Sequence, residues 1–224
     1  MLSLDPRVLI LRITAILFIL TVHEYFHAWA AYRIGDPTAK MLGRVSLNPL
    51  RHLDILGTVM LLFGPFGWGK PVPVDPRNFR NPVRDNMIVS FAGPGSSLAL
   101  GMLFGLGVRG VTALTAMLPF DSGWGPYLTT AHAFFQISTV IGIALGFFNL
   151  LPFFPLDGAH VFRGLVPRTW RPEYDRYLSV SQFILLALLI IPWLTGRPFV
   201  LQWVLYPLVA SVYALAVGGA AAAL

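Results

Sequence analysis

Residues 17–30 read LFILTVHEYFHAWA, an apolar segment that carries two histidines and one glutamate. On a helix, His23 and His27 lie about one turn apart on the same face, so that two ring nitrogens can share one metal ion. Glu24 lies about 100° around the helix from His23, where it can reach water at the metal without being a ligand itself. Ionisable groups inside a membrane span are costly and by default functional, so the segment predicts a metal site.

The composition predicts a multi-pass membrane protein. The 224 residues are 56% hydrophobic and 12% charged, with a mean hydropathy of +0.69, far outside the range of soluble globular proteins. The formal net charge is +6, but the basic residues are scattered among the loops, which predicts a membrane topology signal and no nucleic-acid partner. The sequence has no cysteine, so His and carboxylate groups must hold the metal, which favours zinc or a similar ion.

Hydropathy predicts an all-α membrane protein with about five transmembrane helices. The predicted spans cover about residues 7–32, 84–108, 128–151, 177–193 and 200–220. The apolar stretch 55–66 is too short to cross, so it is expected to be re-entrant or buried against other helices. The proline-rich residues 70–76 are expected to form an extended loop that dips toward the metal site.

Residues 39–47, between the first two predicted spans, alternate between polar side chains and apolar or small ones. A period near two predicts a short strand or small β-hairpin beside the metal helix. An irregular amphipathic loop would fit the same pattern, and this alternative stays open.

The Lys and Arg residues are concentrated in two loops. Of the 16 in the sequence, eight lie between the first and second predicted spans and four between the third and fourth. Basic residues near span ends are retained on the cytoplasmic side. We therefore expect the N-terminus outside the cytoplasm, and five spans then place the C-terminus inside it.

A catalytic zinc site needs a third protein ligand and one position open to water. Asp157 is the best candidate, because Pro152 and Pro155 break helical hydrogen bonding ahead of it. Gly158 then relaxes the backbone, so that the carboxylate can turn inward. Alternatively, Asp157 is the N-cap of a helix at 158–166.

Four other residues are weaker candidates for the site. His160 is the main rival to Asp157 as a ligand, followed by Asp54 and His52. His132 lies inside the third predicted span with no partner motif around it, and it is interpreted as a hydrogen-bonded histidine between helices.

These motifs resemble those of the site-2 protease family of intramembrane zinc metalloproteases. In that family a membrane-embedded His-Glu-x-x-His motif is paired with a later Asn-x-x-Pro-x-x-Pro-x-Asp-Gly motif, and this sequence has both, at residues 23–27 and 149–158. Residues 43–49, 67–74 and 92–94 also resemble the compact prokaryotic branch without a PDZ domain. The likeness covers about residues 8–166, and the last two predicted spans carry none of it.

The resemblance implies a role for each motif residue. His23, His27 and Asp157 would bind one Zn²⁺ per chain, Glu24 would be the general base, and Asn149 would help to hold the scissile peptide or its oxyanion. Family members often have Asn at the position of Ser97, so no role is assigned to Ser97 here.

The implied protein is a single membrane-embedded metalloprotease domain over residues 1–224, with a core at 8–166 and additional spans at 177–220. Its expected partners are the lipid bilayer, in a prokaryotic inner membrane, and single-span membrane proteins as substrates. A transmembrane substrate must unwind locally before it can be cut, and the predicted strand at 39–47 could receive it by β-addition.

The main alternative is a membrane metal-binding protein or transporter that uses the same His and Asp residues. A transport path would need several weak ligand sets in series, whereas the polar residues here converge in two motifs and Glu24 occupies the place that a base needs. A catalytically dead relative is disfavoured because every residue that the chemistry requires is present.

Overall fold

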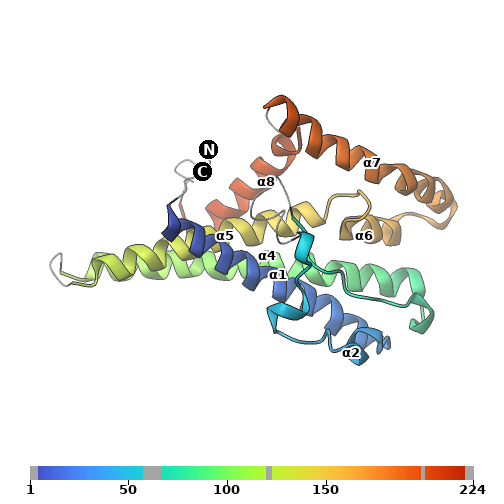
Figure 1. Ribbon diagram of the computed structural model, residues 1–224, viewed down its shortest axis with the longest axis horizontal. Helices are drawn as coiled ribbons and strands as arrows, with labels where there is room; N and C mark the ends of the chain where they lie inside the picture. Colours follow the sequence, from blue (N-terminus) through green and yellow to red (C-terminus); the bar gives the residue numbers. More distant parts are fainter. Residues whose placement is uncertain (1–4, 58–66, 120–122, 198–199, 220–224) are drawn as a thin grey trace.

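The part of the chain that the structure describes folds into five long helices and several short ones (Figure 1). The structure is a computed structural model, and it describes residues 5–57, 67–119, 123–197 and 200–219. The long helices are α1 (Pro6–Ile34), α4 (Pro82–Met117), α5 (Gly125–Asn149), α7 (Arg171–Thr195) and α8 (Val200–Val217). The short ones are α2 (Thr38–Met41), α6 (Asp157–Leu165) and the 3-10 turns η1 (Pro49–Arg51), η2 (Pro76–Asn78) and η3 (Arg168–Trp170). The predicted all-α multi-pass fold is confirmed.

Local sequence signals set the ends of α1 and the start of α4. The Asp5 carboxylate caps α1 by accepting a 2.8 Å hydrogen bond from the Arg7 amide, and Pro6 occupies the first turn, where a helix has no N–H bond to lose. Gly35 ends α1 with a φ of 123°, a conformation that L side chains rarely adopt. Asn81 caps α4 through its side-chain oxygen.

Helices α1, α4 and α5 pack side by side at the centre of the molecule (Figure 1). Glycines allow the close approach of α4 and α5, since a Cβ at Gly142 would lie only 2.9 Å from the Cα of Gly101. Helix α8 packs on the same pair through a buried cluster of Ile143, Val209 and Tyr213. Helix α7 leans away from these helices and packs on α6.

Among the described residues, four helices are long and apolar enough to cross a membrane by length and composition. They are α1, α4, α5 and the segment Arg168–Thr195, which contains α7. Helix α4 continues to Met117, well past the predicted end at 108. The fifth predicted span corresponds to α8, a shorter apolar helix. The chain is therefore an integral membrane protein, and its described residues contain four helices of full span length where about five were predicted.

The two ends of the helical bundle differ from the predicted topology. Phe18 of α1 packs against Phe104 of α4, with ring centroids 5.9 Å apart, so the first half of α1 lies beside the second half of α4. Arg109 of α4 donates a hydrogen bond to the carbonyl of Leu215 near the end of α8. The first turn of α1 and the last turn of α8 thus lie at the same end (Figure 1). Helix α8 runs in the same direction as α4, whereas five crossings would have it run the opposite way. The side of the membrane on which each end lies stays a prediction.

The predicted strand at 39–47 is also wrong. The segment Thr38–Met41 forms the single helical turn α2, and the Asp36 carboxylate supports it by accepting hydrogen bonds from the Thr38 amide and hydroxyl at 3.0 and 2.5 Å. Gly43 follows with a φ of 68°, which reverses the chain. The alternation in the sequence therefore belongs to an irregular amphipathic segment, the alternative interpretation.

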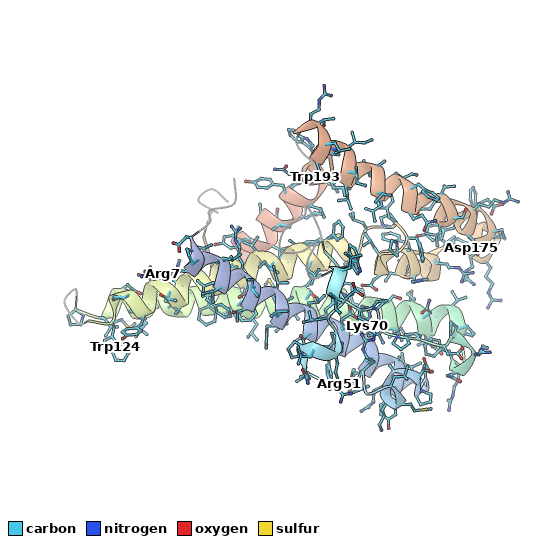
Figure 2. The ribbon with its side chains drawn as sticks, viewed as in Figure 1. Arg7, Arg51, Lys70, Trp124, Asp175 and Trp193 are labelled. Carbon is cyan, nitrogen blue, oxygen red and sulfur yellow. The ribbon has the colours of Figure 1, made fainter. Side chains whose placement is uncertain are left out.

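A short backbone pairing joins the two sides of the connection between α1 and α4. Leu53 and Gly69 form an isolated antiparallel bridge, and the amide of Lys70 donates to the carbonyl of His52 at 2.7 Å. Figure 2 labels Arg51 and Lys70 on these two segments beside α1. Most of the stretch 55–66 lies outside the described residues, so its re-entrant path stays a prediction.

Candidate metal centre

Helix α1 and the first residue of α6 bring three potential metal ligands together. The Nε2 atoms of His23 and His27 lie 3.1 Å apart, and each lies 3.2 Å from Oδ2 of Asp157. His23 and His27 are buried on α1, and Asp157 is half-buried. One ligand atom from each residue lies within 4.8 Å of the others, which makes this a candidate metal site in the described part of the chain.

The turn before α6 aims the Asp157 carboxylate at the histidines. Asp157 is the first residue of α6, while Leu156 occupies the N-cap position and no side chain caps the helix. The N-cap interpretation of Asp157 is therefore wrong. Gly158 is required by space, because a Cβ there would lie 2.2 Å from the carbonyl oxygen of Leu151. This close approach fixes the start of α6 directly against the end of α5.

Helix α4 supports both imidazole rings from behind. Nδ1 of His27 lies 2.8 Å from the carbonyl oxygen of Val89, and Nδ1 of His23 lies 3.0 Å from Oγ of Ser97. A carbonyl only accepts hydrogen bonds, so Nδ1 of His27 carries the proton and Nε2 keeps its lone pair for a ligand. Gly93 makes room for the rings, since a Cβ there would lie 2.2 Å from Nε2 of His27.

The three ligand atoms fit a tetrahedral zinc ion. Zinc bonds to imidazole nitrogen and carboxylate oxygen are about 2.0–2.2 Å long, which places tetrahedral ligand atoms about 3.3–3.5 Å from one another. The observed separations of 3.1 and 3.2 Å are close to this value. Two histidines and one carboxylate also form a donor set that zinc uses in catalytic sites, with a fourth position left for water.

His23, His27 and Asp157 are called the metal group below. They share one cavity of about 600 Å³ with Glu24. Glu24 is 9% exposed, and its Oε1 would lie 3.4 Å from a Cβ added at Gly69, so the backbone of the 67–74 segment runs directly beside the carboxylate. Pro71, Val72, Val74 and Pro76 line the same cavity, so the prediction that residues 70–76 dip toward the metal site is confirmed. The cavity is otherwise lined by residues of α1, α4, α5 and α6, including Leu20, Asn86, Val89, Ser90, Leu145, Phe148, Asn149, Leu156 and His160.

The structure places Asn149 and His160 in this cavity and His52 and Asp54 outside the metal group. The side-chain amide of Asn149 donates to the carbonyl of Leu145 on its own helix at 3.0 Å. His160 lines the cavity, but it is not part of the metal group among the described residues.

His52 is completely buried beneath the connection before α4. Its Nε2 lies 2.6 Å from the carbonyl oxygen of Ser46, which accepts a hydrogen bond from it. Burial lowers the pKa of His52, which favours the neutral imidazole. Asp54 accepts a hydrogen bond from the Gly57 amide at 2.8 Å, an N-terminal capping contact. His52 and Asp54 thus each make a hydrogen bond to the backbone of this connection, and neither belongs to the metal group.

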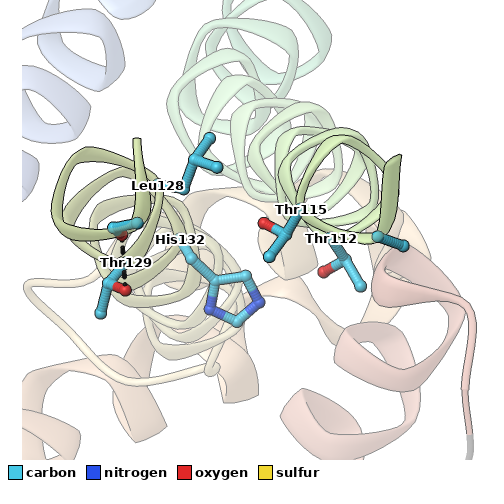
Figure 3. A pocket seen from close by; sticks show the side chains of 7 residues that line it. Thr112, Thr115, Leu128, Thr129 and His132 are labelled. Carbon is cyan, nitrogen blue, oxygen red and sulfur yellow. Dashed lines mark hydrogen bonds between the residues drawn. The ribbon is translucent and has the colours of Figure 1, made fainter. Parts of the chain in front are cut away.

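His132 lies in a separate pocket between the end of α4 and the start of α5 (Figure 3). The pocket has a volume of about 470 Å³, and its threonine hydroxyls each donate to a carbonyl of their own helix. The structure describes no hydrogen bond to the His132 ring, so the predicted interhelical partner is not found among the described residues. One imidazole, among hydroxyls that already donate to backbone carbonyls, does not make a metal site.

Sequence reasoning assigned no role to several residues of the site. Asn86, Ser90, Gly93 and Ser97 all face the metal helix from α4, and their spacing of four, three and four residues places them on one helical face. This pattern of small and polar residues in an otherwise apolar span is a readable signal. Arg44 is buried below the 67–74 segment, and no pattern in the sequence indicates that position.

Comparison with known proteins places this site in a family. The model of peptidase family M50 matches residues 127–192, which include α5, the second motif and α6. YwhC of Bacillus subtilis (strain 168), which is named as a zinc metalloprotease, is 37% identical over 193 residues that cover 85% of this chain and 83% of that protein. The chain belongs to peptidase family M50.

Other relatives extend the match along almost the whole chain. Rip2 of Mycobacterium tuberculosis (strain ATCC 25618 / H37Rv), also named as a zinc metalloprotease, is 32% identical over 220 residues, or 95% of this chain and 79% of that protein. Rip2 of Mycolicibacterium smegmatis (strain ATCC 700084 / mc(2)155) is 34% identical over 201 residues, which cover 83% of this chain and 68% of that protein. No solved structure matches the chain.

Membership of family M50 makes the chain a zinc metalloprotease and confirms the resemblance to site-2 proteases. The expectation that the likeness ends near residue 166 is wrong, because the family model continues to residue 192 and so includes most of α7. The geometry of the metal group agrees with a zinc cofactor.

Proposed function

We propose that this M50 protein is an intramembrane endopeptidase, which hydrolyses peptide bonds within or near the transmembrane segments of single-span membrane proteins. The observation that carries the proposal is the position of the metal group. Two of its three residues, together with Glu24, lie in α1, a helix of membrane-spanning length and composition. Ionisable groups at such a depth are costly unless they serve a function.

In this proposal His23, His27 and Asp157 hold one zinc ion. Zinc at this site supplies a Lewis acid that activates water and polarises the scissile carbonyl. Ser97 and Val89 keep the two imidazoles turned toward the carboxylate. All three ligand residues are thus oriented before a substrate enters.

Glu24 is the proposed general base. It takes a proton from the attacking water and passes it to the leaving amine. Asn149 holds the substrate near the scissile bond, and its side-chain oxygen, which accepts no hydrogen bond from a described residue, can accept a substrate N–H. Donation from the Asn149 amide to an oxyanion requires that the amide release the Leu145 carbonyl, which it contacts at 3.0 Å.

We place the protein in a prokaryotic inner membrane with the metal end toward the cytoplasm. The basic connections 33–84 and 163–176 leave the bundle at the end where the metal helix finishes, and basic loops are retained on the cytoplasmic side. A metal-transport function would call for further ligand sets along a path. The described residues offer one such group, which favours the protease.

The experiment that tests the proposal compares the purified zinc-loaded protein with Glu24→Gln on a panel of single-span substrates. Wild type is expected to cut within or near the span, whereas Glu24→Gln keeps its zinc and loses at least about 99% of the rate, because the base is removed and the ligands are not. Equal cutting by both proteins would exclude Glu24 as the base. Bound zinc without cleavage of any transmembrane substrate by wild type would contradict the intramembrane activity.

A further inference from the structure

One face of α4 forms a wall of the cavity that contains Glu24. Asn86 and Ser90 line the cavity one helical turn apart, and the same face continues through Gly93, which touches the imidazoles, to Ser97. Asn86 and Ser90 are therefore the two polar side chains that α4 presents between the metal group and the basic end of the molecule.

The side chains of Asn86 and Ser90 are available for hydrogen bonds to a ligand. Neither side chain makes a hydrogen bond to any described residue, although Ser90 is only 5% exposed. A serine hydroxyl in a helix can donate to a carbonyl one turn back, as Ser96 does to Gly93 at 2.7 Å. Ser90 does not do so. Among the described residues, the buried side-chain atoms that lack a partner belong to Arg44, His52 and Ser138. The hydroxyl of Ser90 is therefore open to the cavity, where a hydrogen-bonding ligand can reach it.

An unwound peptide segment is the ligand whose chemistry fits. Once its helix opens, a transmembrane substrate has backbone N–H and C=O groups that must find partners, since lipid offers none. In an extended chain, groups that point the same way recur every second residue, about 6.6–6.8 Å apart. Four residues of α-helix rise about 6 Å, so Asn86 and Ser90 match this repeat.

We propose that Asn86 and Ser90 form a backbone-binding ladder, which holds alternate peptide groups of the extended substrate beside Glu24. The Ser90 hydroxyl donates to one substrate carbonyl. The Asn86 amide donates to a second carbonyl and accepts from the neighbouring N–H. This inference rests on the proposed intramembrane peptidase function and names the residues that keep the substrate extended.

The opposite side of the cavity supports the same path. The backbone of Gly69 runs beside Glu24, so an extended peptide lies between this segment and α4 with the carboxylate at one edge. Most of the other lining side chains are apolar, among them Leu20, Val72, Val74, Leu145 and Phe148. The ladder therefore recognises backbone, and its contribution is independent of the substrate sequence.

The test uses the full-length zinc-loaded protein and the variants Asn86→Leu, Ser90→Ala and their combination. Ser96→Ala is the matched control, because Ser96 lies on the same helix, donates to its own backbone and does not line the cavity. Loss of one hydrogen bond to substrate is expected to lower kcat/KM about fivefold, and loss of both about 25-fold. The loss should be similar for single-span substrates of unrelated sequence, while zinc content and the Ser96→Ala rate stay unchanged.

Substrates with a backbone ester in place of one amide separate recognition from a structural defect. An ester lacks the N–H and is a weaker acceptor, so wild type should lose rate at the ester positions that contact the ladder. The Asn86 and Ser90 double variant should lose that position dependence. Unchanged position dependence in the double variant, or a rate within twofold of wild type, would overturn the ladder. A wild type that cuts no transmembrane substrate would instead contradict the proposed function.

Discussion

In the proposed zinc site, Ser97 is a positioning residue for His23. It is completely buried, and its Oγ lies 3.0 Å from Nδ1 of His23. Outer partners of this kind fix the orientation of a ligand imidazole, and their loss typically weakens metal binding 10–100-fold, which is about the decrease in zinc affinity expected for Ser97→Ala. Competition with a chromophoric chelator measures this affinity without any substrate.

Ser138 provides the matched control for Ser97. It is also a completely buried serine, but it lies on α5 and its Oγ has no hydrogen-bond partner in the part of the chain that the structure describes. Ser138→Ala is therefore expected to leave zinc affinity unchanged and to cost little or no stability. Equal zinc affinities for Ser97→Ala and wild type would show that the Ser97 contact does not orient His23.

At the residue scale, the sequence predicted the metal group because its chemistry is encoded locally. His23 and His27 meet through helical spacing alone, and Asp157 follows a proline-broken segment that cannot continue a helix. The partners of their second ring nitrogens were not predicted. Ser97 and Val89 approach from a helix more than 60 residues away, and that pairing depends on how α1 and α4 pack.

Among the connecting elements, Arg44 fixes the segment that runs beside Glu24. Arg44 is 6% exposed, and its guanidinium donates to the carbonyls of Lys70 and Pro71 at 2.5 and 3.2 Å. Arg44→Gln is expected to increase hydrogen exchange at the Lys70 amide at least tenfold and to lower kcat/KM about tenfold, because two charge-assisted hydrogen bonds hold this segment. Zinc content should not change.

Arg51 is the control for Arg44. It also donates to a backbone carbonyl of this connection, that of Gly43 at 2.9 Å, but its side chain is exposed. Arg51→Gln should leave exchange at Lys70 and the cleavage rate near wild type. If the two variants behave alike, the buried guanidinium has no special part in holding the segment.

Asp36 joins the end of α1 to η2, and its contribution depends on pH. Burial raises the pKa of this carboxyl, but hydrogen bonds from Thr38, the Asp75 amide and Asn78 outweigh burial and lower the pKa overall. The ionised form therefore stabilises the fold above the unfolded pKa of about 3.9, and this stabilisation is lost as the pH falls through the lower folded pKa. Asp36→Asn should lower Tm by about 4–8 °C at pH 7, or about 2 kcal/mol.

Thermal unfolding in detergent across a pH series checks this sign. The difference in Tm between wild type and Asp36→Asn should be constant near neutrality and shrink below about pH 4. Asp75→Asn is the control, because the Asp75 carboxylate pairs with the exposed Arg77, and such surface pairs contribute little. A difference that grows on acidification would contradict the assignment.

The elements themselves were predicted unevenly, and the reason is the range of the interactions. Long apolar helices follow from composition alone, so α1, α5 and α7 match their predicted spans closely, and α4 begins as predicted but continues nine residues further. Residues 39–47 were predicted as a strand because the alternation of polar and apolar side chains was given more weight than the turn-forming residues. Asp36 starts a helical turn and Gly43 reverses the chain, and both are short-range signals that the period-two pattern obscured.

At the scale of the whole molecule, hydropathy counted spans but could not supply their directions. Hydropathy predicted that α8 crosses the membrane separately, in the direction opposite to α4. In the structure α8 is a shorter apolar helix that runs in the same direction as α4. Arg109 of α4 holds the carbonyl of Leu215 near the last turn of α8, where a cation also favours the negative end of the helix dipole. That contact depends on packing between distant spans, which span counting does not include.

The placement of both chain ends on one side can be tested with single cysteines, because the chain has none of its own. Arg7→Cys and Gly219→Cys lie at the ends of α1 and α8, and Arg80→Cys lies at the opposite end of the bundle, before α4. A membrane-impermeant maleimide applied to sealed vesicles of one orientation should label the first two from the same face and Arg80→Cys only from the other. Labelling of Gly219→Cys together with Arg80→Cys would restore a fifth crossing and would require α8 to run against α4, away from its contact with Arg109.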